Sequence, residues 1–227
     1  IMLVDWSGSM CEILEDTMKQ LLSLCMFCDK VGIPFDVYAF TNEWNRSSGD
    51  YSDIEKPEVS NVIHIGKEFS MMNILTSRVP RKVMFTQMSN MYVIAHNYSR
   101  RRYEIIPDKL SLSGTPLNEA IVSLRTILPE FKNRNNVEKA HVMILTDGEA
   151  AGTKYTVEHE QYDGSTKIGY GRIYADAPAY IRNRVTGSTR QCFVHDFHNR
   201  GACFTTTLLE DIGCLLYTSD AADEAKW

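Results

Sequence analysis

The fold is decided by Ile1-Met2-Leu3-Val4-Asp5-Trp6-Ser7-Gly8-Ser9, an apolar run followed at once by one carboxylate and two hydroxyl side chains. The run 1–4 is typical of a buried β-strand. Asp5, Ser7 and Ser9 are therefore expected where the chain leaves a strand's carboxyl end, which is where open α/β sheets build their ligand sites. Ligands that are all oxygen suit a small hard cation such as Mg²⁺ or Mn²⁺.

Two later segments carry the same type of chemistry. Ser113-Gly114-Thr115-Pro116-Leu117 precedes a helical pattern, and Thr146-Asp147-Gly148 follows the apolar run 141–145. Asp5-Trp6-Ser7-Gly8-Ser9, taken alone, would also suit an ordinary strand-to-helix turn with a Ser or Asp cap. Three oxygen-bearing loops in this order, each expected at a strand end, favour a common metal site.

Together these segments resemble the metal-ion-dependent adhesion site of von Willebrand factor type A domains, over about residues 1–150. The resemblance implies a three-layer, Rossmann-like α/β fold with a mostly parallel sheet. It implies a Mg²⁺ or Mn²⁺ site with the ligands Asp5, Ser7, Ser9, Thr115 and Asp147. It further implies that the metal keeps an open position for a carboxylate of a protein partner, so that the domain binds a protein and catalyses nothing itself.

Within that family, Phe40-Thr41-Asn42-Glu43-Trp44 and the segment 113–117 resemble the cobaltochelatase CobT-type branch and related proteins of tailed bacteriophages. This resemblance implies a second function, that of a non-catalytic subunit beside an AAA+ ATPase in a chelatase or remodelling complex. The chain has no G-x-x-x-x-G-K-[ST] nucleotide motif of its own. The resemblance also implies a bacterial or phage-infected cytoplasm.

Other chemistries remain open as alternatives. Ser7 or Ser9 could be the nucleophile of a hydrolase, although neither lies in a G-x-S-x-G elbow. Two thiols and two imidazoles near the C-terminus are ligands of the type found in tetrahedral zinc sites, but their spacing is that of no familiar zinc module. The alternative is that they are incidental residues of a loop. They are Cys192, His195, His198 and Cys203. Trp6 and Trp44 could anchor a partner on the surface or pack beneath a loop.

Composition limits the class of protein. The net charge of −5 argues against nucleic-acid binding through general basicity. The most concentrated basic cluster of the chain, Arg100-Arg101-Arg102, suits a solvated loop or a contact with acidic partner residues. No run of 18 apolar residues predicts a membrane span. The chain has six cysteines, and five remain once Cys214 is set aside as part of the C-terminal segment interpreted below as not native. This odd, scattered set predicts free thiols in a reducing cytoplasm, with Cys25 and Cys28 packed in the core.

Hydrophobic periodicity predicts a helix over 10–31, ended by Gly32, and a strand over 35–41 that completes a right-handed βαβ unit. A loop is expected over 42–60. Further helices are predicted over 68–78, 83–98, 117–128 and 205–212, with Gly213 ending the last. Strands are predicted over 62–65 and 139–146, the latter central and buried, and a short extended piece over 103–107. The region 150–190 is expected to be an antiparallel insertion, with turns at 162–164 and 185–187.

The two ends of the chain call for separate expectations. Residues 214–224 resemble the translation of a sequencing adapter read in frame, so 214–227 are interpreted as not native. The domain is then expected over 1–213, as a fragment of metagenomic type whose last strand or strands are missing.

Overall fold

A four-stranded mixed sheet forms the centre of the molecule in the computed structural model, which describes residues 1–43, 59–148, 150–162, 164–172, 179–182, 187, 189–192 and 200–217. The strands are ordered β4 (Phe69–Thr76), β2 (Asp36–Asn42), β1 (Met2–Asp5) and β5 (Met143–Leu145). β1 runs parallel to both β2 and β5, whereas β4 is antiparallel to β2. The α/β class and the mostly parallel sheet are confirmed.

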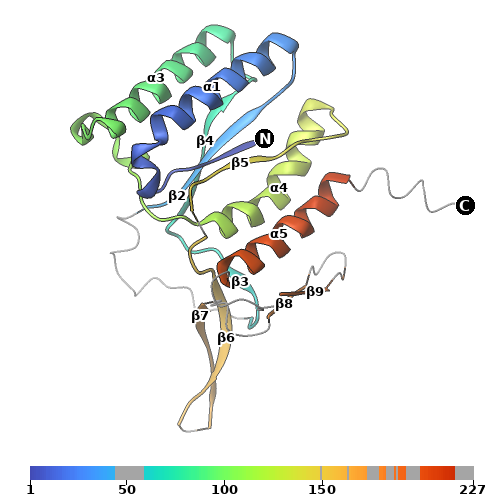
Figure 1. Cartoon of the computed structure of the whole chain (residues 1–227). Helices are drawn as coiled ribbons and strands as arrows, with labels where there is room; N and C mark the ends of the chain where they lie inside the picture. The colour runs from blue at the N-terminus through green and yellow to red at the C-terminus, as the bar shows by residue number, and fades with distance from the viewer. Residues whose placement is uncertain are drawn as a thin grey trace, which may run out of the picture.

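Helices cover both faces of this sheet, giving three layers (Figure 1). α1 (Leu14–Val31) and α3 (Arg81–Ser99) pack on one face, and α4 (Leu117–Asn135) and α5 (Arg200–Tyr217) on the other. Successive β1 residues alternate between the two cores: Val4 joins the α1 and α3 side, and Leu3 joins the α4 and α5 side. Asp5 lies at the end of β1, where the apolar run stops.

The connection from β1 to β2 matches its prediction closely. A 3₁₀ turn, η1 (Ser9–Glu12), leads into α1, and Gly32 caps that helix with φ of 73°. Only a residue without Cβ adopts this left-handed conformation at little cost. β2 then pairs with β1 in parallel, with Asp5 opposite Phe40. The carboxyl ends of both strands therefore meet at one edge of the sheet.

The helix predicted over 68–78 is wrong, because this segment is strand β4. It contacts the apolar core on both faces, with Met71 on one side and Met72 on the other. Because β4 contacts both cores, its apolar residues come in adjacent pairs and do not alternate, and periodicity does not distinguish this pattern from a helix. The extended piece predicted over 103–107 is also wrong: Tyr103–Ile105 forms a 3₁₀ turn, η3.

Three predicted boundaries also change. The strand predicted over 139–146 is shortened to β5, which lies at one end of the described four-stranded sheet rather than at its centre. It is also partly exposed rather than buried, with Met143 43% exposed. It pairs only with Met2–Val4, so its ladder can be no longer than that partner. α4 continues past Pro129 to Asn135, where Asn136 caps it with φ of 50°. α5 continues past Gly213, which does not end it.

The predicted antiparallel insertion is confirmed for its described residues. β6 (Lys154–Glu160) and β7 (Thr166–Arg172) form a hairpin that stands out from the body of the molecule (Figure 1), and β6 also pairs with β3 (Ile63–His64). β8 (Ala179–Arg182) pairs with β9 (Thr189–Cys192). The predicted turn residues 163, 185 and 186, and most of the loop predicted over 42–60, lie outside the described residues.

Two predictions from composition are also met in the described part of the chain. No described helix combines the length and the apolar character that crossing a bilayer requires. Cys25 and Cys28 are buried in the core beneath α1 as free thiols, and burial raises the pKa of Cys25 to about 12. A thiol with so high a pKa is a packing group rather than a nucleophile.

Candidate metal centre

Two loops lie side by side at the carboxyl end of β1. Ser7 forms an isolated parallel bridge with Ser113. The backbone N–H of Gly8 donates to the Ser113 carbonyl over 2.9 Å, and the Ser113 N–H donates to the Trp6 carbonyl over 3.3 Å. The loop that carries Ser7 and Ser9 is therefore held against the loop that carries Thr115 by a short, strand-like parallel pairing.

Four of the five predicted metal ligands come together at this edge. The Oγ atoms of Ser7 and Ser9 are 3.0 Å apart. Ser9 Oγ donates to Asp147 Oδ1 over 3.0 Å, across 138 residues of sequence. Asp5 joins the set through Thr146, whose Oγ1 donates to Asp5 Oδ2 over 2.7 Å. The residues of the first and third predicted loops thus converge, as their positions after parallel neighbouring strands require.

Thr115 stands in the right segment but is linked to the site through its backbone. Its carbonyl accepts a hydrogen bond from Ala151 N–H over 2.9 Å, which joins the second loop to the chain that follows β5. No hydrogen bond joins its hydroxyl to the other four predicted ligands in the described structure. Its role as a metal ligand stays a prediction.

Asp5 carries the clearest electrostatic signal at the site. The residue is fully buried, and its Oδ1 has no hydrogen-bond partner among the described residues. Burial raises the pKa of this carboxyl, and the nearby Asp147 charge acts in the same direction, while hydrogen bonds from Thr146 and Ser7 oppose both. A buried acceptor left unsatisfied beside a second carboxylate is costly unless a cation or a proton compensates it.

The donor chemistry fits a hard divalent cation. The converging side chains offer two carboxylates and two hydroxyls, all oxygen, which suits Mg²⁺ or Mn²⁺ and not a soft metal. Among the described residues, no cluster of three or more His, Cys, Asp or Glu side chains is arranged to hold a metal. A site here would depend on its serine hydroxyls as much as on its carboxylates.

Trp6 supports the site from below and is not a surface anchor. Its side chain is fully buried and its Nε1 donates to the Leu110 carbonyl over 2.7 Å. The Tyr98 hydroxyl donates to the same carbonyl over 2.7 Å, and the two rings meet edge to face. The second loop is thereby fixed to the end of α3. Trp44 lies outside the described residues.

Sequence reasoning missed two polar residues near these loops. Thr146, next to Asp147 in sequence, holds Asp5, and its hydroxyl at a strand end was the available signal. Glu119, in the first turn of α4, has a buried and unpartnered Oε2, and burial raises the pKa of this carboxyl. Nothing in the amphipathic pattern of α4 distinguishes Glu119 from an ordinary first-turn acid.

The alternative chemistries gain little from the geometry. Within the described chain, Ser7 and Ser9 bond to each other, Ser9 also donates to Asp147, and neither serine bonds to a histidine. This pattern lacks the base that a nucleophilic serine needs. For the zinc alternative, His195 and His198 lie outside the described residues, and the side chains of Cys192 and Cys203 are not described.

Comparisons of this chain with protein-family models, with curated proteins and with solved structures give no match. The functional argument therefore rests on the geometry and chemistry of the site.

Proposed function

We propose that the chain is a divalent-metal-dependent protein-binding domain of the von Willebrand factor type A kind. In this proposal Mg²⁺ or Mn²⁺ is held by oxygen ligands from three loops and accepts a carboxylate of a protein partner at an open position. The proposed ligands are Asp5, Ser7, Ser9, Thr115 and Asp147. The domain would work in a bacterial or phage-infected cytoplasm, binding neither nucleic acid nor membrane.

One observation carries the proposal. Asp5 is buried at the end of β1 with an unpartnered Oδ1, while Ser9 and Asp147 bond across the same edge. Hydrogen bonds from Thr146 and from the side chain and backbone of Ser7 reach this carboxylate, yet its Oδ1 has no partner among the described residues. Two carboxylates held together with an oxygen left open are what a bound cation would stabilise.

The decisive variant is Asp147→Ala, measured by Mn²⁺ titration and by capture of a partner with Mg²⁺ or with EDTA. We expect metal binding and Mg²⁺-dependent capture to be lost while circular dichroism and the melting transition persist, because Asp147 is exposed. The exposed Glu130→Gln, on α4, is the control and retains both activities. Capture that persists in EDTA would contradict the proposal.

A second candidate function is a non-catalytic subunit of an AAA+-driven chelatase or remodelling complex. It is favoured by the two segments that carry the CobT-type resemblance, since they touch: a Cβ added at Gly114 would lie 2.9 Å from Asn42 Nδ2. This close approach places Asn42, at the end of β2, beside the loop that carries Thr115. Copurification with an AAA+ ATPase, dependent on ATP and on Mg²⁺, is the test, and metal binding without such a partner favours the first function.

A further inference from the structure

A basic surface borders the candidate metal loops on the side of α3. It consists of the segment 100–109, whose described side chains are mostly exposed. The segment contains three consecutive arginines and Lys109, against two acids, Glu104 and Asp108. It also has two exposed apolar side chains. Tyr103 is 52% exposed and Ile105 is 64% exposed. Arginine with exposed aromatic and aliphatic groups is a composition enriched at protein interfaces.

This basic surface contacts the 3₁₀ turn η1, which begins at the proposed ligand Ser9. Ser99 Oγ donates to the Cys11 carbonyl over 3.5 Å, and the Cys11 Sγ lies 3.8 Å from the Tyr103 hydroxyl. Arg101 Nη2 lies 3.6 Å from the Oε1 of Glu12. Glu12 is only one 3₁₀ turn, about 6 Å of rise, beyond Ser9. The arginines and the proposed metal ligands therefore share one face of the molecule.

One of the three arginines is already paired with a carboxylate of the chain itself. Arg101 holds the carboxylate of Glu12, although both side chains are largely exposed, at 75% and 83%. In the described part of the chain, Arg100 and Arg102 form no ion pair. A guanidinium binds a carboxylate through two parallel hydrogen bonds, so this surface is suited to a ligand that brings several carboxylates.

We propose that the basic surface 100–109 binds an acidic segment of the same partner that supplies the carboxylate to the metal; this inference rests on the proposed function. In an extended segment, acidic side chains two to four residues from the metal-bound one lie about 7–13 Å away. This span can be compared with the rise of about 6 Å from Ser9 to Glu12, followed by the 3.6 Å contact between Glu12 and Arg101. The metal selects one carboxylate, and the arginines select an acidic sequence around it.

Peptide binding to the purified chain tests the inference. The probes are a labelled peptide with one central glutamate flanked by glutamines, and the same peptide with every glutamine replaced by glutamate. With Mg²⁺, we expect roughly tenfold tighter binding of the all-glutamate peptide, with a steep salt dependence. Arg100→Gln/Arg102→Gln should abolish this difference but keep Mn²⁺ affinity and binding of the single-glutamate peptide.

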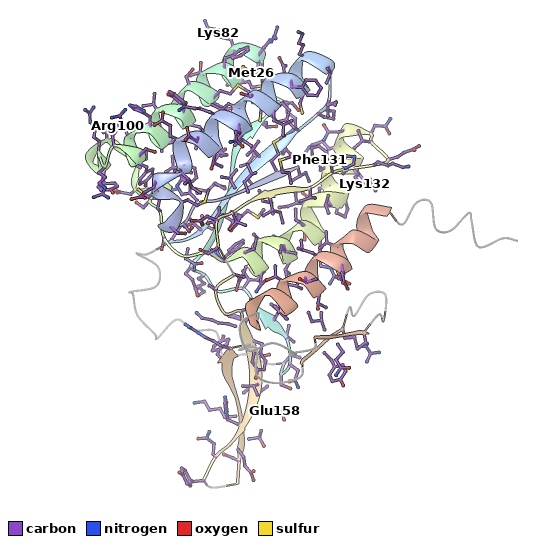
Figure 2. All side chains as sticks on the ribbon, in the orientation of Figure 1. Met26, Lys82, Arg100, Phe131, Lys132 and Glu158 are labelled. Atoms are coloured by element: carbon purple, nitrogen blue, oxygen red, sulfur yellow. The ribbon has the colours of Figure 1, made fainter. Side chains whose placement is uncertain are left out.

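The matched control is Lys30→Gln/Lys82→Gln, which also removes two positive charges, but at the far end of α1 and α3. Figure 2 shows Lys82 and Arg100 at opposite ends of α3. This control should retain the tenfold difference. Equal binding of the two peptides by the unmodified chain, or equal losses in both double variants, would overturn the inference.

The remaining outcomes separate this inference from the proposed function. If neither peptide binds in a Mg²⁺-dependent way, the proposed function fails. If the all-glutamate peptide binds equally well in EDTA, or with Asp147→Ala, the arginines bind acids independently of the metal and the shared-partner inference alone fails. Tighter binding of a uridine oligonucleotide that depends on Arg100 and Arg102 would assign the surface to nucleic acid and overturn the inference.

Discussion

At the scale of single residues, Thr146 orients the carboxylate at the centre of the candidate site. Its Oγ1 donates to Asp5 Oδ2 over 2.7 Å and accepts from Gly148 N–H over 3.3 Å, so one hydroxyl links two of the proposed metal loops. This hydrogen bond occupies Oδ2 and leaves Oδ1 as the atom available to a cation. Groups of this type, one step removed from a metal, commonly change metal affinity 10- to 100-fold.

Thr146→Val should therefore weaken Mn²⁺ binding about tenfold, because Asp5 loses its orienting donor while the shape of the side chain is kept. The affinity is measured by isothermal titration calorimetry. Thr146→Ser restores the hydroxyl and should restore most of the affinity. Equal losses in the Ser and Val variants would show that the methyl group, and not the hydrogen bond, matters.

Asp5 also predicts a pH dependence for the metal-free fold. Burial raises its pKa in the folded chain above that in the unfolded chain. The fold thus binds this proton more readily, and between the two pKa values its stability falls as pH rises. In EDTA, Asp5→Asn should melt higher than the unmodified chain at neutral pH, with the gap closing as pH falls through the pKa of the folded state. A gap that does not vary with pH would contradict this assignment.

At the scale of elements, the second loop is held in place by the end of α3. The Tyr98 hydroxyl donates to the Leu110 carbonyl over 2.7 Å and accepts from Leu112 N–H over 3.2 Å. Tyr98 is buried and packs against Trp6, so these hydrogen bonds form away from water. The segment that leads to Ser113 and Thr115 is thereby set in register with the loop after β1.

Tyr98→Phe should lower the free energy of unfolding by about 1–2 kcal/mol, because Leu112 N–H loses its acceptor while the ring is retained. Urea unfolding measures this loss, and amide exchange at Leu112 should accelerate. The more exposed Tyr103→Phe serves as the control and should cost less. A Tyr98→Phe chain with unchanged stability and exchange would show that these hydrogen bonds do not hold the loop.

The same elements show what a sequence can and cannot predict here. The loops of Asp5 and Asp147 were predictable because each follows an apolar run that forms a strand, although only β1 is buried and β5 is partly exposed. Strand β4 was not predictable, because an apolar segment that contacts both cores lacks the alternation that identifies a strand. The bond from Thr146 to Asp5 joins residues 141 positions apart, so it depends on how two loops meet in space.

At the scale of the whole molecule, a buried ionic cluster lies at the end of β2 away from the candidate metal. The side chain of Asp36 is only 1% exposed and receives Arg134 Nη2 at 2.6 Å and Thr76 Oγ1 at 2.6 Å. Arg78 Nε lies 3.4 Å from the same carboxylate. The cluster ties the last turn of α4 to β2 and β4. Four residues of strand, about 13 Å, separate Asp36 from Phe40, which pairs with Asp5.

This separation predicts that stability and metal binding can be altered independently. Arg134→Met should lower the free energy of unfolding by about 2 kcal/mol, because the buried Asp36 would keep only its weaker ion pair with Arg78, at the longer distance of 3.4 Å. Arg81→Met removes the more exposed pair with Asp29 and should cost under about 1 kcal/mol. Urea unfolding compares the two variants. Mn²⁺ affinity should be unchanged in both, since neither reaches the carboxyl ends of β1 and β5. A loss of Mn²⁺ affinity in Arg134→Met alone would instead mean that the cluster at one end of β2 is coupled to the loops at the other.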